Sequence, residues 1–244
     1  MKNDPYIVAA FLKAREASNW VADGTNPIVT ISRQMGALGE EIAYRTSNLL
    51  TEMNQGKHPW VVVDKDLGER VIADHHLPKQ IANFFSGEQI LSINDHLNGI
   101  LGISTAGPVI LEKMVSTIIQ LARIGHIIFV GRAAHLITAQ FPRSIHIRIV
   151  GSFDCRVGRI AESKHCSWDD AATEVQKVDE QRRHFASTYF TSDLDDSENF
   201  DMLFNTNRMS VEESAQVIAE LVSSDDFRKQ RVTQLRELRQ KVLG

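Results

Sequence analysis

The stretch that most constrains the fold of this chain runs from Ile28 to Ala43 and reads IVTISRQMGALGEEIA. It begins with a short apolar run rich in β-branched residues, passes through a turn with Gly36 and Gly39, and continues in an amphipathic helical pattern. A strand, a glycine turn and a helix in this order bring backbone N–H groups and the positive end of a helix dipole to one point. The stretch therefore predicts a site for an anion such as phosphate.

The common phosphate loop, G-x-x-x-x-G-K-[ST], also carries a lysine for the β- and γ-phosphates and a hydroxyl for magnesium. Aligned with that pattern, this chain has Arg33 at the first glycine, Leu38 at the second and Gly39 at the lysine. The strand, glycine turn and helix of a phosphate loop are thus present in the sequence, whereas the lysine and the hydroxyl residue are missing. We expect Arg33 to replace the lysine. Glu41, in the first turn of the helix, either binds magnesium in place of the hydroxyl or only favours the helix dipole.

Composition limits the kind of protein. With 244 residues and 43% hydrophobic content, the chain can bury one substantial core. A net charge of −4 argues against a nucleic-acid partner. Two cysteines, Cys155 and Cys166, are too few for a disulfide framework or a zinc cluster, and we expect a reducing, cytoplasmic environment and no metal held by side chains alone. No apolar run approaches the roughly 18 to 20 residues that span a bilayer.

Buried strand patterns alternate with helical patterns along the chain. Strands are predicted at the start of the phosphate-site stretch, before Asp64, before Gly131, from Ser144 and in the segment FDMLFNT. This alternation predicts a mainly parallel sheet with right-handed crossovers. We expect an N-terminal helix over 1–24, one domain over 25–222 and a basic helical tail over 223–244. The domain has a helical insertion at about 67–123 and a lid at about 156–190, and the terminal helices offer a route to homo-oligomers.

Polar side chains cluster where these strands end. In an open parallel sheet, ligands bind beyond the carboxyl ends of the strands. Ser32 and Arg33 end the first strand, Asp64 follows the second and Arg132 the third, and the helix after the fourth strand carries Arg156 and Arg159. Arginines suit phosphate because the guanidinium bonds two oxygens at once and stays charged. Asp64 is equally suited to magnesium, to an attacking hydroxyl or to capping the next helix.

A second cluster lies in the segment VDEQRRHF, where Asp179, Arg182 and Arg183 fall within one helical turn. In a phosphate enzyme such a helix can act as a lid that brings positive charge onto the transferred phosphoryl group. The alternative is that Asp179 and Arg183 form an ordinary surface ion pair worth a few tenths of a kcal/mol.

Together these segments resemble the cytidylate kinase-like family, a branch of the P-loop nucleoside monophosphate kinases. The resemblance rests on VTISRQMGALGEEIA, VVVDKDL, IIFVGRAAHLI, IHIRIVGSFDCRVGRI, VDEQRRHF and FDMLFNTNRMSVEESAQVI. It implies a P-loop three-layer α/β sandwich and transfer of the ATP γ-phosphoryl group, with Mg²⁺, to a nucleoside monophosphate. Ala133 stands where cytidylate kinases carry an aspartate, and Leu38 where this branch has glycine, so the acceptor stays open.

The resemblance also implies roles for the arginines. Arg132 would hold the nucleoside monophosphate, Arg156 and Arg159 would lie near ATP, and Arg182 would reach the transferred phosphoryl group, supported by Asp179. Three hypotheses follow: an ATP-dependent kinase of small phosphorylated molecules, a nucleotide-binding regulatory module without catalysis, and an interaction protein that uses its terminal helices.

Overall fold

A computed structural model describes residues 26–64, 114–115 and 118–224. In this part of the chain, five parallel strands form one sheet in the order β2-β3-β1-β4-β5. The strands are β1 (Ile28–Arg33), β2 (Val61–Val63), β3 (Ile127–Val130), β4 (Ser144–Val150) and β5 (Met202–Asn205). The helices are α2 (Gly39–Met53), α7 (Ala134–Ile137), α8 (Phe153–Lys164), α9 (Trp168–Phe190) and α10 (Val211–Ser223), with a 3₁₀ turn η1 (Ser197–Asn199).

The predicted α/β fold with a parallel sheet is confirmed. The predicted helix over 1–24, most of the insertion at 67–123 and nearly all of the tail at 223–244 lie outside the described residues.

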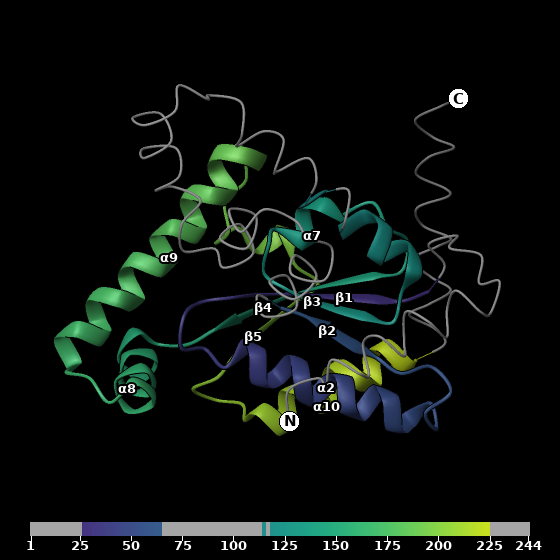
Figure 1. Ribbon diagram of the computed structural model, residues 1–244, viewed down its shortest axis with the longest axis horizontal. Helices are drawn as coiled ribbons and strands as arrows, with labels where there is room; N and C mark the ends of the chain where they lie inside the picture. The colour runs from purple at the N-terminus through teal and green to yellow at the C-terminus, as the bar shows by residue number, and fades with distance from the viewer. Residues whose placement is uncertain (1–25, 65–113, 116–117, 225–244) are drawn as a thin grey trace, which may run out of the picture.

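Helices cover both faces of the sheet, which gives three layers (Figure 1). The α2 and α10 helices lie together on one face and α7 lies on the other. Alternate residues of β1 and β4, such as Ile31 and its register partner Ile147, point at α2 and α10 and are fully buried. This apolar core fixes the position of the loop that joins β1 to α2.

Three serines set the starts of the later helices. The side chains of Ser152, Ser167 and Ser210 each accept a hydrogen bond from the backbone N–H three residues ahead. Ser210 and Glu213 complete a reciprocal capping box. Such caps are local and need no tertiary contact, so neighbouring residues alone fix where these helices start.

The other face of β1 and β4 carries buried polar side chains. The ring of His146 lies between Thr30, at 2.8 Å from Nδ1, and Ser144, at 3.0 Å from Nε2. Arg148 is 5% exposed and donates to Ser32 Oγ at 2.8 Å and to Asp195 at 2.9 Å. Burial lowers the pKa of the Arg148 guanidinium, and Asp195 acts in the opposite direction. A polar strip therefore runs along the sheet toward the end of β1.

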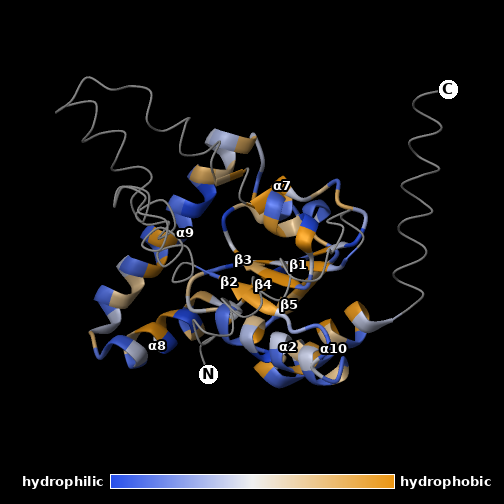
Figure 2. Cartoon of the chain, turned by 45° about the vertical axis from the view of Figure 1, so that its right-hand side comes forward, coloured by the Kyte–Doolittle hydropathy of each residue, from blue (hydrophilic) through white to orange (hydrophobic). Residues whose placement is uncertain are grey.

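Apolar residues concentrate on the sheet and on the inner sides of its helices, whereas α9 is largely hydrophilic (Figure 2). Within the described ranges, no helix combines the length and the apolar character that a membrane crossing needs.

Candidate functional site

A cavity of about 420 Å³ lies beyond the carboxyl ends of β1 and β3. Its walls are the β1–α2 loop, the first turn of α2, the β3–α7 turn, one side of α8 and the middle of α9. The predicted site residues on these walls are Ser32, Arg33, Gly36, Gly39, Glu41, Arg132, Arg159 and Arg182. One cavity thus brings together residues from four separate segments, at the place where ligands bind in parallel α/β sheets.

The β1–α2 loop is held in one conformation by its neighbours. The N–H of Gln34 bonds to the Ile149 carbonyl at 3.1 Å, and the Gln34 side chain accepts from Gly151 N–H at 3.1 Å. Gly36 has a φ of +73°, and a Cβ there would lie 2.6 Å from the Arg156 carbonyl oxygen. Only glycine meets both conditions.

The loop delivers the N-terminus of α2 to the cavity. Leu38, the N-cap residue, has a left-handed φ of 61° and makes no side-chain cap. The first-turn N–H groups of a helix have no intrahelical acceptors, so they favour an anion at this end. The predicted strand, glycine turn and helix are therefore present in this order, and phosphate binding by them stays a prediction.

Arg33 lies across two glycines. A Cβ on Gly39 would lie 2.8 Å from Arg33 Cβ, and a Cβ on Gly131 would lie 2.1 Å from its Nη1. The Arg33 side chain thus fills space that any side chain at either position would need. Its guanidinium pairs with Glu40 at 3.4 Å, and burial lowers its pKa.

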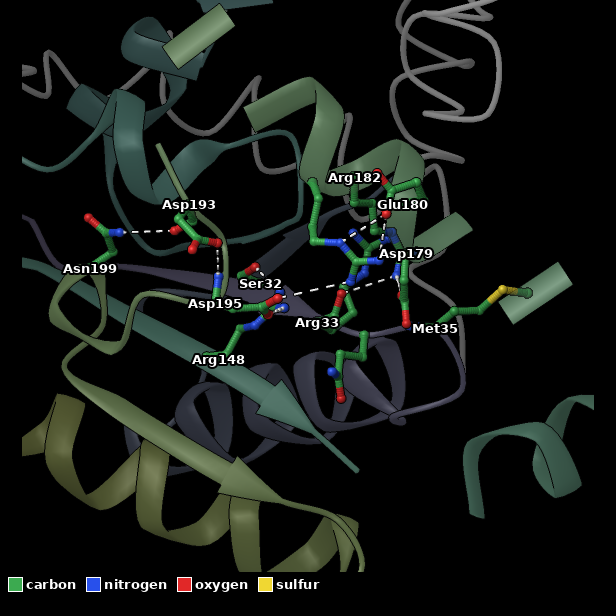
Figure 3. Close-up of polar contacts among 12 residues, drawn as sticks. Ser32, Arg33, Met35, Arg148, Asp179, Glu180, Arg182, Asp193, Asp195 and Asn199 are labelled. Atoms are coloured by element: carbon green, nitrogen blue, oxygen red, sulfur yellow. Dashed lines mark hydrogen bonds and ion pairs between the residues drawn. The ribbon is translucent and has the colours of Figure 1, made fainter. Parts of the chain in front are cut away.

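A second cation, the half-buried Arg182 of α9, approaches Arg33 (Figure 3). Arg182 Nη1 donates to the Arg33 carbonyl at 3.1 Å and lies 3.7 Å from the Asp179 carboxylate. Burial lowers the pKa of Arg182 far below its usual value, and the neighbouring charge of Arg33 lowers it further. An anion bound at this cavity wall would favour the charged form of Arg182 beside the second cation.

Arg132 comes from a left-handed turn. Gly131, Arg132 and Ala133 have consecutive φ values of 78°, 63° and 52°. The Gly131 N–H bonds to the Ile31 carbonyl at 2.9 Å, which ties this turn to β1. Left-handed non-glycine residues cost about 1–2 kcal/mol each, so the rest of the fold must hold Arg132 in this position on the cavity wall.

Arg156 and Arg159 both bind the backbone of the loop. Arg156 donates to the carbonyls of Met35 at 2.9 Å and Gly151 at 3.0 Å. Arg159 donates to the Gly36 carbonyl at 3.1 Å and to Thr206 Oγ1 at 2.9 Å. Arg159 also lines the cavity, whereas Arg156 is buried behind the loop. Their contacts are those of residues that support a loop.

Asp179 connects α9 to the same loop. Its carboxylate accepts from the Met35 N–H at 2.8 Å and from Arg156 at 2.7 Å, and only 8% of the residue is exposed. The alternative of a surface ion pair between Asp179 and Arg183 is wrong, because Asp179 is buried. Arg183 instead bonds Glu180 at 2.7 Å, which raises its pKa, and it lies outside the main cavity wall.

The acidic candidates occupy different environments. Asp64 is buried and accepts from the Tyr44 hydroxyl at 2.5 Å. It does not line the cavity itself, but its charge acts on Arg33 and raises the pKa of that residue. Counted from Arg33, the hydroxyl position of the phosphate-loop pattern is Glu40, which pairs with Arg33, and not Glu41. Glu41 lines the cavity and is exposed. Across residues 26–64, 114–115 and 118–224, no group of three His, Cys, Asp or Glu side chains gathers as a metal site.

The sequence analysis missed several residues. Arg148 was detectable, because Ser144, His146 and Arg148 alternate with isoleucines in a strand and therefore share one face. Lys164, paired with Glu174, and His135 both line the cavity, and no local pattern marks either of them.

Comparisons with known proteins agree with this geometry. The model of the cytidylate kinase-like family matches residues 28–208, so the chain belongs to that family. A crystal structure of an uncharacterized protein from Eubacterium ventriosum is similar in fold, with a TM-score of 0.58 at 20% identity over 82% of this chain and 99% of that one. A shikimate kinase structure from Bacteroides thetaiotaomicron gives a TM-score of 0.42 at 13% identity, over 81% and 99% of the two chains. No curated protein sequence matches.

The family indicates a kinase-like, nucleotide-binding role in general.

Proposed function

We propose that this protein transfers the γ-phosphoryl group of ATP to a nucleoside monophosphate or a similar small phosphorylated molecule. One observation carries the proposal: Arg33, Arg132 and Arg182 line a single cavity at the N-terminus of a 15-residue helix. Phosphoryl transfer depends almost wholly on positioning and on neutralising negative charge. A lysine-free site can supply both if arginines take the role of the lysine.

Each arginine has a role that its position supports. Arg33, at the end of β1 and beside the α2 N-terminus, neutralises the phosphates of ATP where the lysine of the common loop would. Arg132, on the β3–α7 turn, holds the phosphate of the acceptor. Arg182 reaches the cavity from α9 and stabilises the charge of the phosphoryl group in flight. Asp179, Arg156 and Arg159 keep the loop in the conformation that binds the phosphates.

The residues present also fit magnesium bound together with the nucleotide. Glu41 lines the cavity in the first turn of α2, and magnesium is commonly held by one or two carboxylates, substrate phosphates and water. Bound there, magnesium would neutralise charge on the β- and γ-phosphates.

The test is release of ADP from ATP and magnesium against a panel of nucleoside monophosphates, nucleosides and sugars. We expect turnover with one acceptor class. Arg33→Ala should lower kcat by about 10³-fold or more, because a single cation at this transition state is worth that much. Arg208→Ala, which removes an exposed arginine away from the cavity, is the matched control and should leave kcat unchanged.

A nucleotide-binding module without catalysis is the second candidate. It is favoured by Gly39, since the lysine position of the loop carries no side chain and the adjacent space is filled by Arg33. Nucleotide binding by the wild type, with no ADP release for any acceptor, would support this candidate over the kinase.

A further inference from the structure

His135 is a buried histidine on the wall of the cavity. It follows Arg132 by three residues, lies in the first turn of α7 and is 4% exposed. Its ring stacks on Phe200, with the centroids 4.8 Å apart and the planes 27° apart. Apolar residues also line this cavity, and they include Ala133, Val178, Phe185, Ala186 and Leu194.

The Nε2 atom of His135 has no hydrogen-bonding partner among the described residues. A buried polar atom without a partner is costly, and buried polar groups in native proteins are nearly always satisfied. Phenylalanine would keep the stacking on Phe200 without this cost. Because His135 lines the cavity and no described residue bonds Nε2, a molecule bound in the cavity can supply the missing hydrogen-bonding group.

The imidazole is neutral at physiological pH. Burial lowers the pKa of His135 to about 3, and the nearby charges of His146 and Arg148 act in the same direction. A neutral imidazole has one donor and one acceptor nitrogen and gives little attraction to a phosphate. Its partner is therefore an uncharged polar group, while the phosphates fall to the arginines.

We propose that His135 determines acceptor specificity in this cavity by hydrogen bonding to an uncharged hydroxyl, amide or amino group of the acceptor. Arg132, from the same turn, holds the acceptor's phosphate. The acceptor is thus an organic phosphate with a polar, uncharged part that rests against the apolar wall. This inference rests on the proposed function, because it assigns Arg132 to the acceptor.

The test compares His135→Phe, which keeps the ring and removes Nε2, with His135→Gln, which restores a polar atom near the same place. We expect His135→Phe to raise the KM for the acceptor about 10- to 100-fold, because one buried hydrogen bond to the substrate is lost. His135→Gln should recover part of this loss, and the KM for ATP should change by less than about twofold in both variants. His184→Phe, an exposed histidine of α9, is the control.

Thermal melting separates recognition from a structural role. His135→Phe should melt no lower than the wild type, because it replaces an unpartnered nitrogen by a ring carbon of the same shape. A lower melting temperature together with weaker ATP binding would overturn the inference, and so would an unchanged acceptor KM. Ribose 5-phosphate, tested as an acceptor beside the nucleotide, shows which part of the acceptor bonds His135. If His135→Phe raises the KM for both acceptors equally, the polar group lies on the sugar. If the KM for ribose 5-phosphate does not change, the polar group lies on the base.

Failure of the proposed function gives a different result. If the wild type releases no ADP with any acceptor, phosphoryl transfer is wrong, and calorimetric binding of nucleoside monophosphates decides the role of His135. Weaker binding to His135→Phe would then support the inference, and equal binding, or no binding to the wild type, would overturn it.

Discussion

Two groups of arginines meet at the same loop and differ in what their guanidinium groups contact. Arg156 and Arg159 of α8 bond backbone carbonyls of the loop, and Arg156 also pairs with a buried carboxylate. Arg33 and Arg182 line the cavity, and the charge of Arg33 lowers the pKa of Arg182. Residue type alone therefore does not identify a phosphate ligand. The first group should contribute mainly to stability and the second mainly to ligand binding.

The largest expected effect is on the supporting group. Arg156→Ala removes one partner of a buried ion pair and two hydrogen bonds to carbonyls, so we expect a loss of about 3–5 kcal/mol in the free energy of unfolding. Urea denaturation measures it. The double variant Arg156→Met/Asp179→Leu should recover part of the loss, because no buried charge is left alone. If Arg156→Ala keeps the wild-type stability but loses nucleotide binding, Arg156 belongs with the ligand-binding arginines and not with the supporting group.

The cavity group should show the opposite behaviour. Arg33→Ala, Arg132→Ala and Arg182→Ala should each weaken ATP or nucleoside monophosphate binding about 10- to 100-fold, because each removes charge-assisted hydrogen bonds to phosphate. Isothermal calorimetry measures the affinities. Chemical denaturation should show that Arg33→Ala loses less unfolding free energy than Arg156→Ala. If Arg33→Ala and Arg132→Ala keep the wild-type thermal shift with nucleotides, the phosphate site is wrongly placed.

The position of Arg33 depends on Gly39, which gives a third test. Gly39→Ala places a Cβ 2.8 Å from Arg33 Cβ and should cost about 1–3 kcal/mol of unfolding free energy through overpacking. Gly158→Ala in α8 is the matched control, since its Cβ would meet only Trp168 at 3.6 Å. The control should gain up to about 1 kcal/mol from helix propensity. Equal effects of the two substitutions would contradict the close contact.

The smallest effect is expected at Arg183, which belongs to neither group. It is partly exposed and paired with Glu180, so Arg183→Ala should change the unfolding free energy by less than about 0.5 kcal/mol. Nucleotide affinity should stay at the wild-type value in the same calorimetric assay. A loss of affinity comparable to that of Arg182→Ala would add Arg183 to the cavity group.

The sequence predicts the strands and helix starts well and the arginine contacts poorly. Apolar β-branched runs and serine caps act through neighbouring residues, so β1, β4 and the start of α9 were found directly. Arg156 and Asp179 meet across 23 residues, and only the packing of α8 against α9 brings them together. Such a contact leaves no signal in a local pattern.

The environment of His135 likewise cannot be predicted from the local sequence. Its burial and its unpartnered nitrogen depend on Phe200, 65 positions away, and on the cavity wall built by α9. The sequence placed Arg132 at the site because glycine and arginine follow a strand. Nothing near His135 distinguishes it from the other eight histidines of the chain.

The position of the Arg33 side chain between Gly39 and Gly131 also limits how this loop can change during evolution. A lysine at position 39 and an arginine at position 33 would compete for one volume, so they exclude each other. A return to the lysine-bearing loop by single substitutions must pass either through a crowded sequence with both side chains or through one with neither cation. The two loop chemistries are therefore separated by a step that single substitutions cross only at a loss of fitness.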